Sequence, residues 1–129
     1  MIQTSLSSAR MPRANFGPHG SEEEALAELV RRLADALDPQ MIWLFGSRAR
    51  GTARPDSDFD LLVVAKENGG FDSDDYEKVD APLRGCGIGT DIIPCALDVF
   101  RGSLGLRTSI VHQIVDQGRL IYGEMPNDA

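Results

Sequence analysis

Three aspartates stand where the chain enters predicted strands. Asp58 and Asp60 are two residues apart at the start of the apolar run Phe59–Ala65, and Asp91 lies near the start of a second run, Thr90–Pro94. Residues two apart in a strand project to the same face, so the first two carboxylates are neighbours. Charges about 4 Å apart repel by about 4 kcal/mol at an effective dielectric near 20, and a third carboxylate adds to this. A hard divalent cation such as Mg²⁺ offsets the repulsion and leaves positions open for water and phosphate.

The hydrophobic pattern predicts the elements that must position these aspartates. Ser21 and Glu24 form a capping box, and the apolar residues after them have helical spacing as far as Leu37, where Pro39 ends the helix. Apolar runs predict strands at 41–45, 59–65, 90–94 and 119–122. The stretch 46–57 is predicted to be a turn that contains one helical turn. Further helices are predicted at about 74–83 and 106–118, the second with Gly118 as a left-handed terminator.

The order of these elements predicts where the aspartates meet. The run 59–65 is apolar on both faces, which indicates a central strand. A right-handed crossover through the helix at 74–83 makes this strand parallel to 90–94, and the short connection from 41–45 favours an antiparallel pair. The end of the first strand and the beginnings of the next two then share one edge of the sheet. The predicted fold class is α/β of the α+β type, with a small mixed sheet of three to four strands flanked by helices.

Charge and composition exclude several function classes. The 129 residues include 13 Lys plus Arg and 20 Asp plus Glu, a net charge of −7, and residues 56–80 hold nine of the acids and only two lysines. An acidic domain gains little from counterion release, so direct binding of nucleic acid is not expected. No apolar run approaches the roughly 18 residues of a membrane-spanning helix. Two cysteines in a chain without a signal-peptide pattern favour free thiols and a cytoplasmic location.

The domain is expected to occupy residues 21–123. Residues 1–20 are interpreted as a poorly ordered leader, because they lack an amphipathic pattern and contain four prolines and glycines near their end. Met11 is an alternative start of the chain. Residues 124–129 are interpreted as a C-terminal tail.

One motif joins these features. Gly46-Ser47 is followed, after ten residues, by Asp58-Phe59-Asp60. This spacing, within the stretch LFGSRARGTARPDSDFDLLVV, resembles the signature of the DNA polymerase β-type nucleotidyltransferase superfamily, and especially its small stand-alone members, the minimal nucleotidyltransferase (MNT) domains. The resemblance covers roughly residues 21–123. It implies the fold of that superfamily and the transfer of a nucleotide from a nucleoside triphosphate to an acceptor hydroxyl, with release of pyrophosphate.

The resemblance also implies roles for the three aspartates. Asp58 and Asp60 would bridge two Mg²⁺ ions, and Asp91 would hold only the ion that activates the acceptor oxygen. Asp91 would also accept the proton of that hydroxyl. Such chemistry needs one metal to lower the pKa of the attacking hydroxyl and another to neutralise the leaving phosphates.

The phosphates of the nucleotide would lie at the Gly-Ser motif. The backbone at Gly46 and the hydroxyl of Ser47 would hold the β and γ phosphates, since a Cβ at Gly46 would obstruct close approach. Arg48 and Arg50 are candidates for guanidinium contacts to phosphate oxygens, and Arg54 is a weaker one.

The acceptor is left open among three functions. In MNT domains the partner is typically a HEPN-domain toxin, and the MNT protein acts as antitoxin by transferring AMP from ATP to a tyrosine of that toxin. The expectation that this chain borrows its acceptor surface from a partner rests on its small size. One alternative is an antitoxin that acts by binding alone, and another is a nucleotidyltransferase for a small molecule such as an aminoglycoside. A homo-oligomer would be compatible with this last function. No motif in the sequence specifies which base of the nucleotide is preferred.

Overall fold

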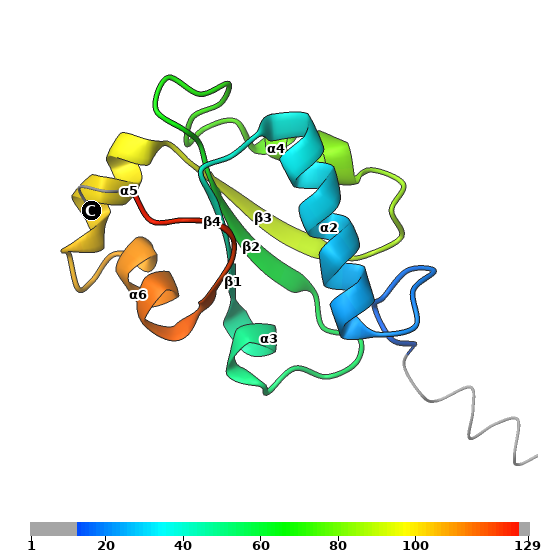
Figure 1. Cartoon of the computed structure of the whole chain (residues 1–129). Coiled ribbons are helices and arrows are strands. Elements are labelled where there is room, and N and C mark those ends of the chain that lie inside the picture. Colours follow the sequence, from blue (N-terminus) through cyan, green and yellow to red (C-terminus); the bar gives the residue numbers. More distant parts are fainter. Residues whose placement is uncertain (1–12, 127–129) are drawn as a thin grey trace, which may run out of the picture.

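One mixed sheet of four strands organises the protein. The computed structural model describes residues 13–126, and in it the strand order is β3-β2-β1-β4 (Figure 1). Strand β1 is antiparallel to both β2 and β4, whereas β2 and β3 are parallel. The bounds are Met41–Phe45 for β1, Phe59–Val64 for β2, Thr90–Cys95 for β3 and Arg119–Gly123 for β4. The predicted mixed sheet, with 59–65 as a central strand, is confirmed.

Helix α2, Glu22–Leu37, covers one face of the sheet. The Ser21 hydroxyl accepts a hydrogen bond from the backbone N–H of Glu24 at 3.1 Å, and the Glu24 carboxylate accepts one from the N–H of Gly20 at 3.0 Å. The predicted capping box therefore forms, although its return bond reaches one residue further back. The helix ends at Asp38, which adopts a left-handed conformation with φ of 46°.

Two hydrophobic clusters lie on opposite faces of the sheet. On β2, Phe59, Leu61 and Val63 pack toward α2, together with side chains from α4 (Tyr76–Asp80) and the 3₁₀ helix η1 (Ala81–Leu83). Leu62 and Val64 pack on the other face, toward α5 (Leu97–Leu104) and α6 (Ile110–Gln117). Figure 1 shows α2 and the α5–α6 pair on these two sides. Because Asp60 shares the alternation of Leu62 and Val64, it belongs to the α5–α6 face.

The C-terminal third differs from the sequence-based prediction. Helix α5 was not predicted, and α6 begins at Ile110 instead of near residue 106, because the Ser109 hydroxyl caps it by accepting from the N–H of His112. Gly118 is extended, with φ of −94°, so its prediction as a left-handed terminator is wrong. Glycine is required there by a close approach, since a Cβ would lie 2.6 Å from the carbonyl oxygen of Leu44.

The segment 13–20 packs against the edge of the sheet where β2 and β3 begin. Phe16 joins the α2-side cluster, and Gly17, with φ of 59°, lies against the backbone of Cys86 and Gly87. The structure thus differs from the expectation of a poorly ordered leader for these eight residues, whereas the remainder of that leader, 1–12, lies outside the described residues. Within residues 13–126, no helix is both long and apolar enough to cross a bilayer.

Candidate functional site

Three carboxylates meet at the edge where β2 and β3 begin. Asp58 directly precedes β2, Asp60 is the second residue of β2, and Asp91 is the second residue of β3. Asp60 and Asp91 are Cα partners in the parallel ladder, so their side chains project to the same face of the sheet. Asp58 and Asp91 are exposed and Asp60 is partly buried. The topology therefore brings these aspartates to one edge, as their positions in the sequence indicate.

The electrostatics of this edge converge on Asp60. Burial raises the pKa of the Asp60 carboxyl, and the negative charges of Asp91 and Asp58 raise it further. The positive charge of Arg50 acts in the opposite direction. Asp58 and Asp91 are therefore each close enough to repel the Asp60 carboxylate, and a cation beside Asp60 would relieve this repulsion.

Gly46 brings the backbone into contact with the Asp60 carboxylate. It follows the end of β1 and begins the short helix α3, Gly46–Arg50, with φ of 72°. A Cβ at this position would overlap Oδ2 of Asp60. Only glycine combines this left-handed backbone with the missing side chain, so the Gly-Ser motif and Asp60 form one surface. Ser47 is the next residue of α3 and is partly buried.

The two arginines of α3 have different environments. The side chain of Arg48 is 2% exposed, and its guanidinium donates to the carbonyls of Pro55 and Ser57 and to the Glu22 carboxylate, the last at 2.7 Å. It also stacks on Phe59, 4.2 Å from the ring centroid. The structure thus gives Arg48 a structural role in place of the phosphate contact that the sequence suggested. Arg50 is exposed and acts electrostatically on Asp60.

Arg54, the weaker candidate, lies on the surface of the loop. Its side chain is 81% exposed and forms an ion pair with Asp56 at 3.6 Å.

The donor chemistry of this edge fits a hard divalent cation. All three side chains offer carboxylate oxygens, which Mg²⁺ prefers, and burial together with the charges of Asp91 and Asp58 disfavours the ionised form of Asp60. Across residues 13–126, however, no three histidine, cysteine, aspartate or glutamate side chains are gathered into a ready-made metal cluster. The structure therefore provides the ligand types and the shared edge, while the carboxylates are not drawn together around one point.

A cavity of about 280 Å³ adjoins this edge on the α6 face. It extends from Gly46 and Arg50 to the first and last turns of α6, and its lining residues are Phe45, Gly46, Arg50, Ile110, Gln113, Ile114 and Gln117. Apolar side chains form much of its lining, and two carboxamides and one guanidinium supply polar groups. Its volume is near the lower limit of small-molecule sites, which suits part of a ligand whose remainder lies outside it.

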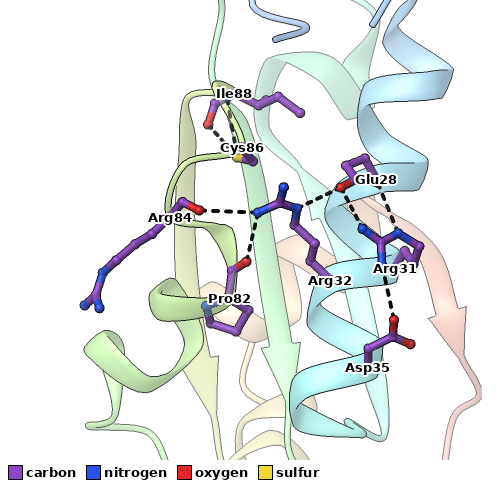
Figure 2. Close-up of polar contacts among 8 residues, drawn as sticks. All are labelled: Glu28, Arg31, Arg32, Asp35, Pro82, Arg84, Cys86 and Ile88. Atoms are coloured by element: carbon purple, nitrogen blue, oxygen red, sulfur yellow. Dashed lines mark hydrogen bonds and ion pairs between the residues drawn. The ribbon is translucent and has the colours of Figure 1, made fainter. Parts of the chain in front are cut away.

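The chain leading into β3 is fixed to α2 by Arg32. Its guanidinium donates to the Glu28 carboxylate at 2.8 Å and to the backbone carbonyls of Pro82 and Arg84 at 3.4 and 3.3 Å (Figure 2). Glu28 also binds Arg31, and these two arginines lower the pKa of Glu28 to about 2. The helix thereby holds the segment that precedes Asp91.

Two residues at this edge were not singled out from the sequence. Asn15 lies in the segment interpreted as a leader, and its side chain bonds to Ser57 and Gly89. Gly89 lies in the loop before β3, and a Cβ there would lie 2.5 Å from Oδ1 of Asp58. The asparagine gives no periodic signal, and its importance follows from contacts with residues 42 and 74 positions away.

Comparisons with known proteins agree with the fold and the motif. The family model described as Polymerase beta, Nucleotidyltransferase matches residues 27–127. Among solved structures, a proposed nucleotidyltransferase from Sulfolobus solfataricus is 24% identical over 77% of this chain and 78% of its own, with a TM-score of 0.54, and this likeness concerns the fold. A toxin-antitoxin with AMP-PNP is 26% identical over 81% of this chain and 75% of its own, with a TM-score of 0.49. None of the curated proteins matches the chain.

The matched span of the family model contains the Gly-Ser motif, all three aspartates and the four strands that bring them together. The chain belongs to the polymerase beta nucleotidyltransferase family.

Proposed function

We propose that this protein is a Mg²⁺-dependent nucleotidyltransferase that transfers AMP from ATP to a hydroxyl group of a partner protein. The observation that carries the proposal is the meeting of Asp58, Asp60 and Asp91 at one edge of the sheet, with the backbone of Gly46 against the Asp60 carboxylate. Nucleotidyl transfer requires anionic ligands for metal ions directly beside a backbone that admits phosphates, and this edge supplies both.

Asp58, Asp60 and Asp91 would hold the Mg²⁺ ions. When bound, Mg²⁺ would supply charge neutralisation for the phosphates and would lower the pKa of the attacking hydroxyl. A carboxylate oxygen of Asp91 would accept the proton of that hydroxyl, because Asp91 is exposed and acts electrostatically on Asp60. General-base catalysis requires such a group within reach of the acceptor.

Gly46, Ser47 and Arg50 would bind the phosphates of the nucleotide. Arg50 is the exposed arginine of α3, and its positive charge partly offsets the negative charge of the Asp60 carboxylate. The cavity between α3 and α6 begins at Gly46 and Arg50, so we assign to it the nucleoside part of ATP. Its apolar wall suits the face of a base, and the carboxamides of Gln113 and Gln117 suit its polar edge.

The acceptor would be a HEPN-domain toxin, with this protein as its antitoxin. Support comes from the resemblance of the Gly-Ser and Asp-Phe-Asp motif to MNT domains. The exposure of Asp58 and Asp91 is compatible with a hydroxyl carried by a large molecule.

Transfer of label tests this function. The full chain is incubated with Mg²⁺ and ATP labelled at the α phosphate, together with the purified protein encoded in the neighbouring reading frame. Label on the partner is the expected result, whereas ATP labelled at the γ phosphate should leave it unlabelled. The matched control is Asp58→Asn with Asp60→Asn. Inhibition of the toxin by this variant would favour binding without catalysis, and label on an added aminoglycoside alone would identify a small-molecule acceptor.

A further inference from the structure

Asn15 lies where the two strands that carry the carboxylates begin. All polar groups of its side chain are engaged. Nδ2 donates to the carbonyls of Ser57 and Gly89, both at 2.9 Å, and Oδ1 accepts from the N–H of Gly89 at 2.6 Å. The backbone N–H of Asn15 donates to the carbonyl of Pro55 at 2.8 Å. One residue therefore contacts the chain entering β2 and the chain entering β3.

These contacts lie immediately before the carboxylates. Ser57 is bonded to Asp58 along the chain, and Gly89 precedes Asp91 by two residues. The β2–β3 ladder extends to the hydrogen bond from the N–H of Phe59 to the carbonyl of Gly89, at 3.1 Å. The bonds of Asn15 to Ser57 and Gly89 lie just outside the ladder, next to Asp58.

Gly89 couples the asparagine to Asp58. A Cβ at Gly89 would lie 2.5 Å from Oδ1 of Asp58 and 3.2 Å from Nδ2 of Asn15. The carboxylate, the glycine and the carboxamide are therefore packed against one another. A shift of the β3 entry relative to Asn15 would change the space available to Asp58.

The opposite side of the β2 entry is held by Arg48. Its guanidinium donates to the same Ser57 carbonyl that Asn15 binds, and it also donates to the carbonyl of Pro55. The loop before Asp58 is thus fixed from two sides. Of these two residues, Asn15 alone bonds to Gly89 as well, so it links the β2 entry to the β3 entry.

We infer that Asn15 is a positioning residue of the carboxylate site: it joins the entries of β2 and β3 and so sets the separation of Asp58 from Asp91. Carboxylates that repel one another need such a restraint when no cation is present. Residues that orient metal ligands typically affect metal affinity or activity by about 10–100-fold. The inference rests on the proposed function, because it assigns a cation to this edge.

The test measures binding of Mn²⁺ to the full chain in the absence of nucleotide, by electron paramagnetic resonance. Asn15→Ala should weaken Mn²⁺ binding by about 10–100-fold. The matched control is Gln40→Ala, which removes another long-range bond from a carboxamide to a carbonyl, that of Glu124 at 2.8 Å, at the opposite end of the sheet. Gln40→Ala should retain wild-type affinity for Mn²⁺.

A double-mutant cycle separates positioning from general destabilisation. If Asn15 acts by placing Asp91, its substitution should have little further effect on Mn²⁺ binding in an Asp91→Asn background. Hydrogen exchange of the Gly89 amide should also accelerate in Asn15→Ala without metal. Equal Mn²⁺ affinity of wild type and Asn15→Ala, or an equal loss in Gln40→Ala, would overturn the inference alone. Absence of Mn²⁺ binding by the wild type would overturn the proposed function and this inference with it.

Discussion

Arg48 and Arg50 are two residues apart in one short helix, yet their side chains have different environments. Arg48 is buried against Phe59 and its donors are directed at backbone carbonyls of the loop before Asp58. Arg50 is exposed beside the carboxylates. A helix of 3.6 residues per turn points such neighbours in different directions, so only one of them faces the site.

Substitution of these arginines should separate stability from nucleotide binding. Arg48→Ala should lower the free energy of unfolding by about 3 kcal/mol, because it removes a buried guanidinium and leaves several carbonyls unpaired. Arg50→Ala should leave stability nearly unchanged but raise the KM for ATP about 10-fold, the effect of one charge-assisted hydrogen bond. Urea unfolding and steady-state kinetics measure the two effects. The assignment would be wrong if Arg50→Ala destabilised the fold as much as Arg48→Ala.

At the scale of elements, α2 does more than cover the sheet. Glu28 aligns Arg32, which in turn binds the carbonyls of Pro82 and Arg84 before β3 (Figure 2). Glu22, in the first turn of the same helix, binds Arg48. The helix therefore supports both chain segments that lead to the carboxylates, in addition to packing on the sheet through its buried face.

The lowered pKa of Glu28 predicts how this support depends on pH. A carboxylate whose pKa falls on folding stabilises the native state above its unfolded pKa, and this stabilisation is lost as the pH falls toward the folded value. For Glu28 the loss extends from pH about 4.5 down to about 2. The Tm difference between wild type and Glu28→Gln should therefore be largest near neutral pH and shrink below pH about 4.5.

Thermal melts across this pH range check the prediction. Glu23→Gln, on the same helix and exposed, is the matched control and should follow wild type. A Tm difference for Glu28→Gln that stays constant down to pH about 3 would contradict the role of its ionised form.

For the whole molecule, stability and the proposed binding of a cation are opposed at Asp60. Burial and two neighbouring carboxylates raise the pKa of this group. A carboxyl group with a raised folded pKa stabilises the native state at low pH, and this contribution is lost as the pH rises through that value. Near neutral pH the ionised Asp60 therefore destabilises the protein when no cation is bound.

Melting with and without ligand should reveal this opposition. Without ligand at neutral pH, Asp60→Asn should melt at a higher temperature than wild type. With Mg²⁺-ATP at 100 times its Kd, wild type should gain about 2.7 kcal/mol, whereas Asp60→Asn should gain little. Asp56→Asn, on the surface of the preceding loop, is the control and should respond to Mg²⁺-ATP as wild type does. An equal gain in Asp60→Asn would contradict a cation site at this edge.

The sheet and the edge at which the aspartates meet could be predicted from the sequence. Hydrophobic runs of strand length, the capping box at Ser21 and the crossover rule are local or topological signals, so they predicted β1 to β4, α2 and the parallel pair. The glycine at position 46 and its spacing to Asp58 and Asp60 likewise indicated that the Gly-Ser motif and these aspartates lie together, and Gly46 does contact the Asp60 carboxylate.

The elements and contacts whose stability comes from distant residues could not be predicted from the sequence. Helix α5 has eight residues with Gly102 in its interior, so it has little intrinsic preference and is stabilised by burial of Leu97 and Phe100. Asn15 acquires its role from backbone groups of Ser57 and Gly89, which precede two strands far along the chain. Arg48 is directed inward because a cluster of carbonyls and an aromatic ring is assembled there by the fold. Side-chain partners brought together by folding leave no local pattern, and for that reason the carboxylates could be predicted from the sequence but the residues that position them could not.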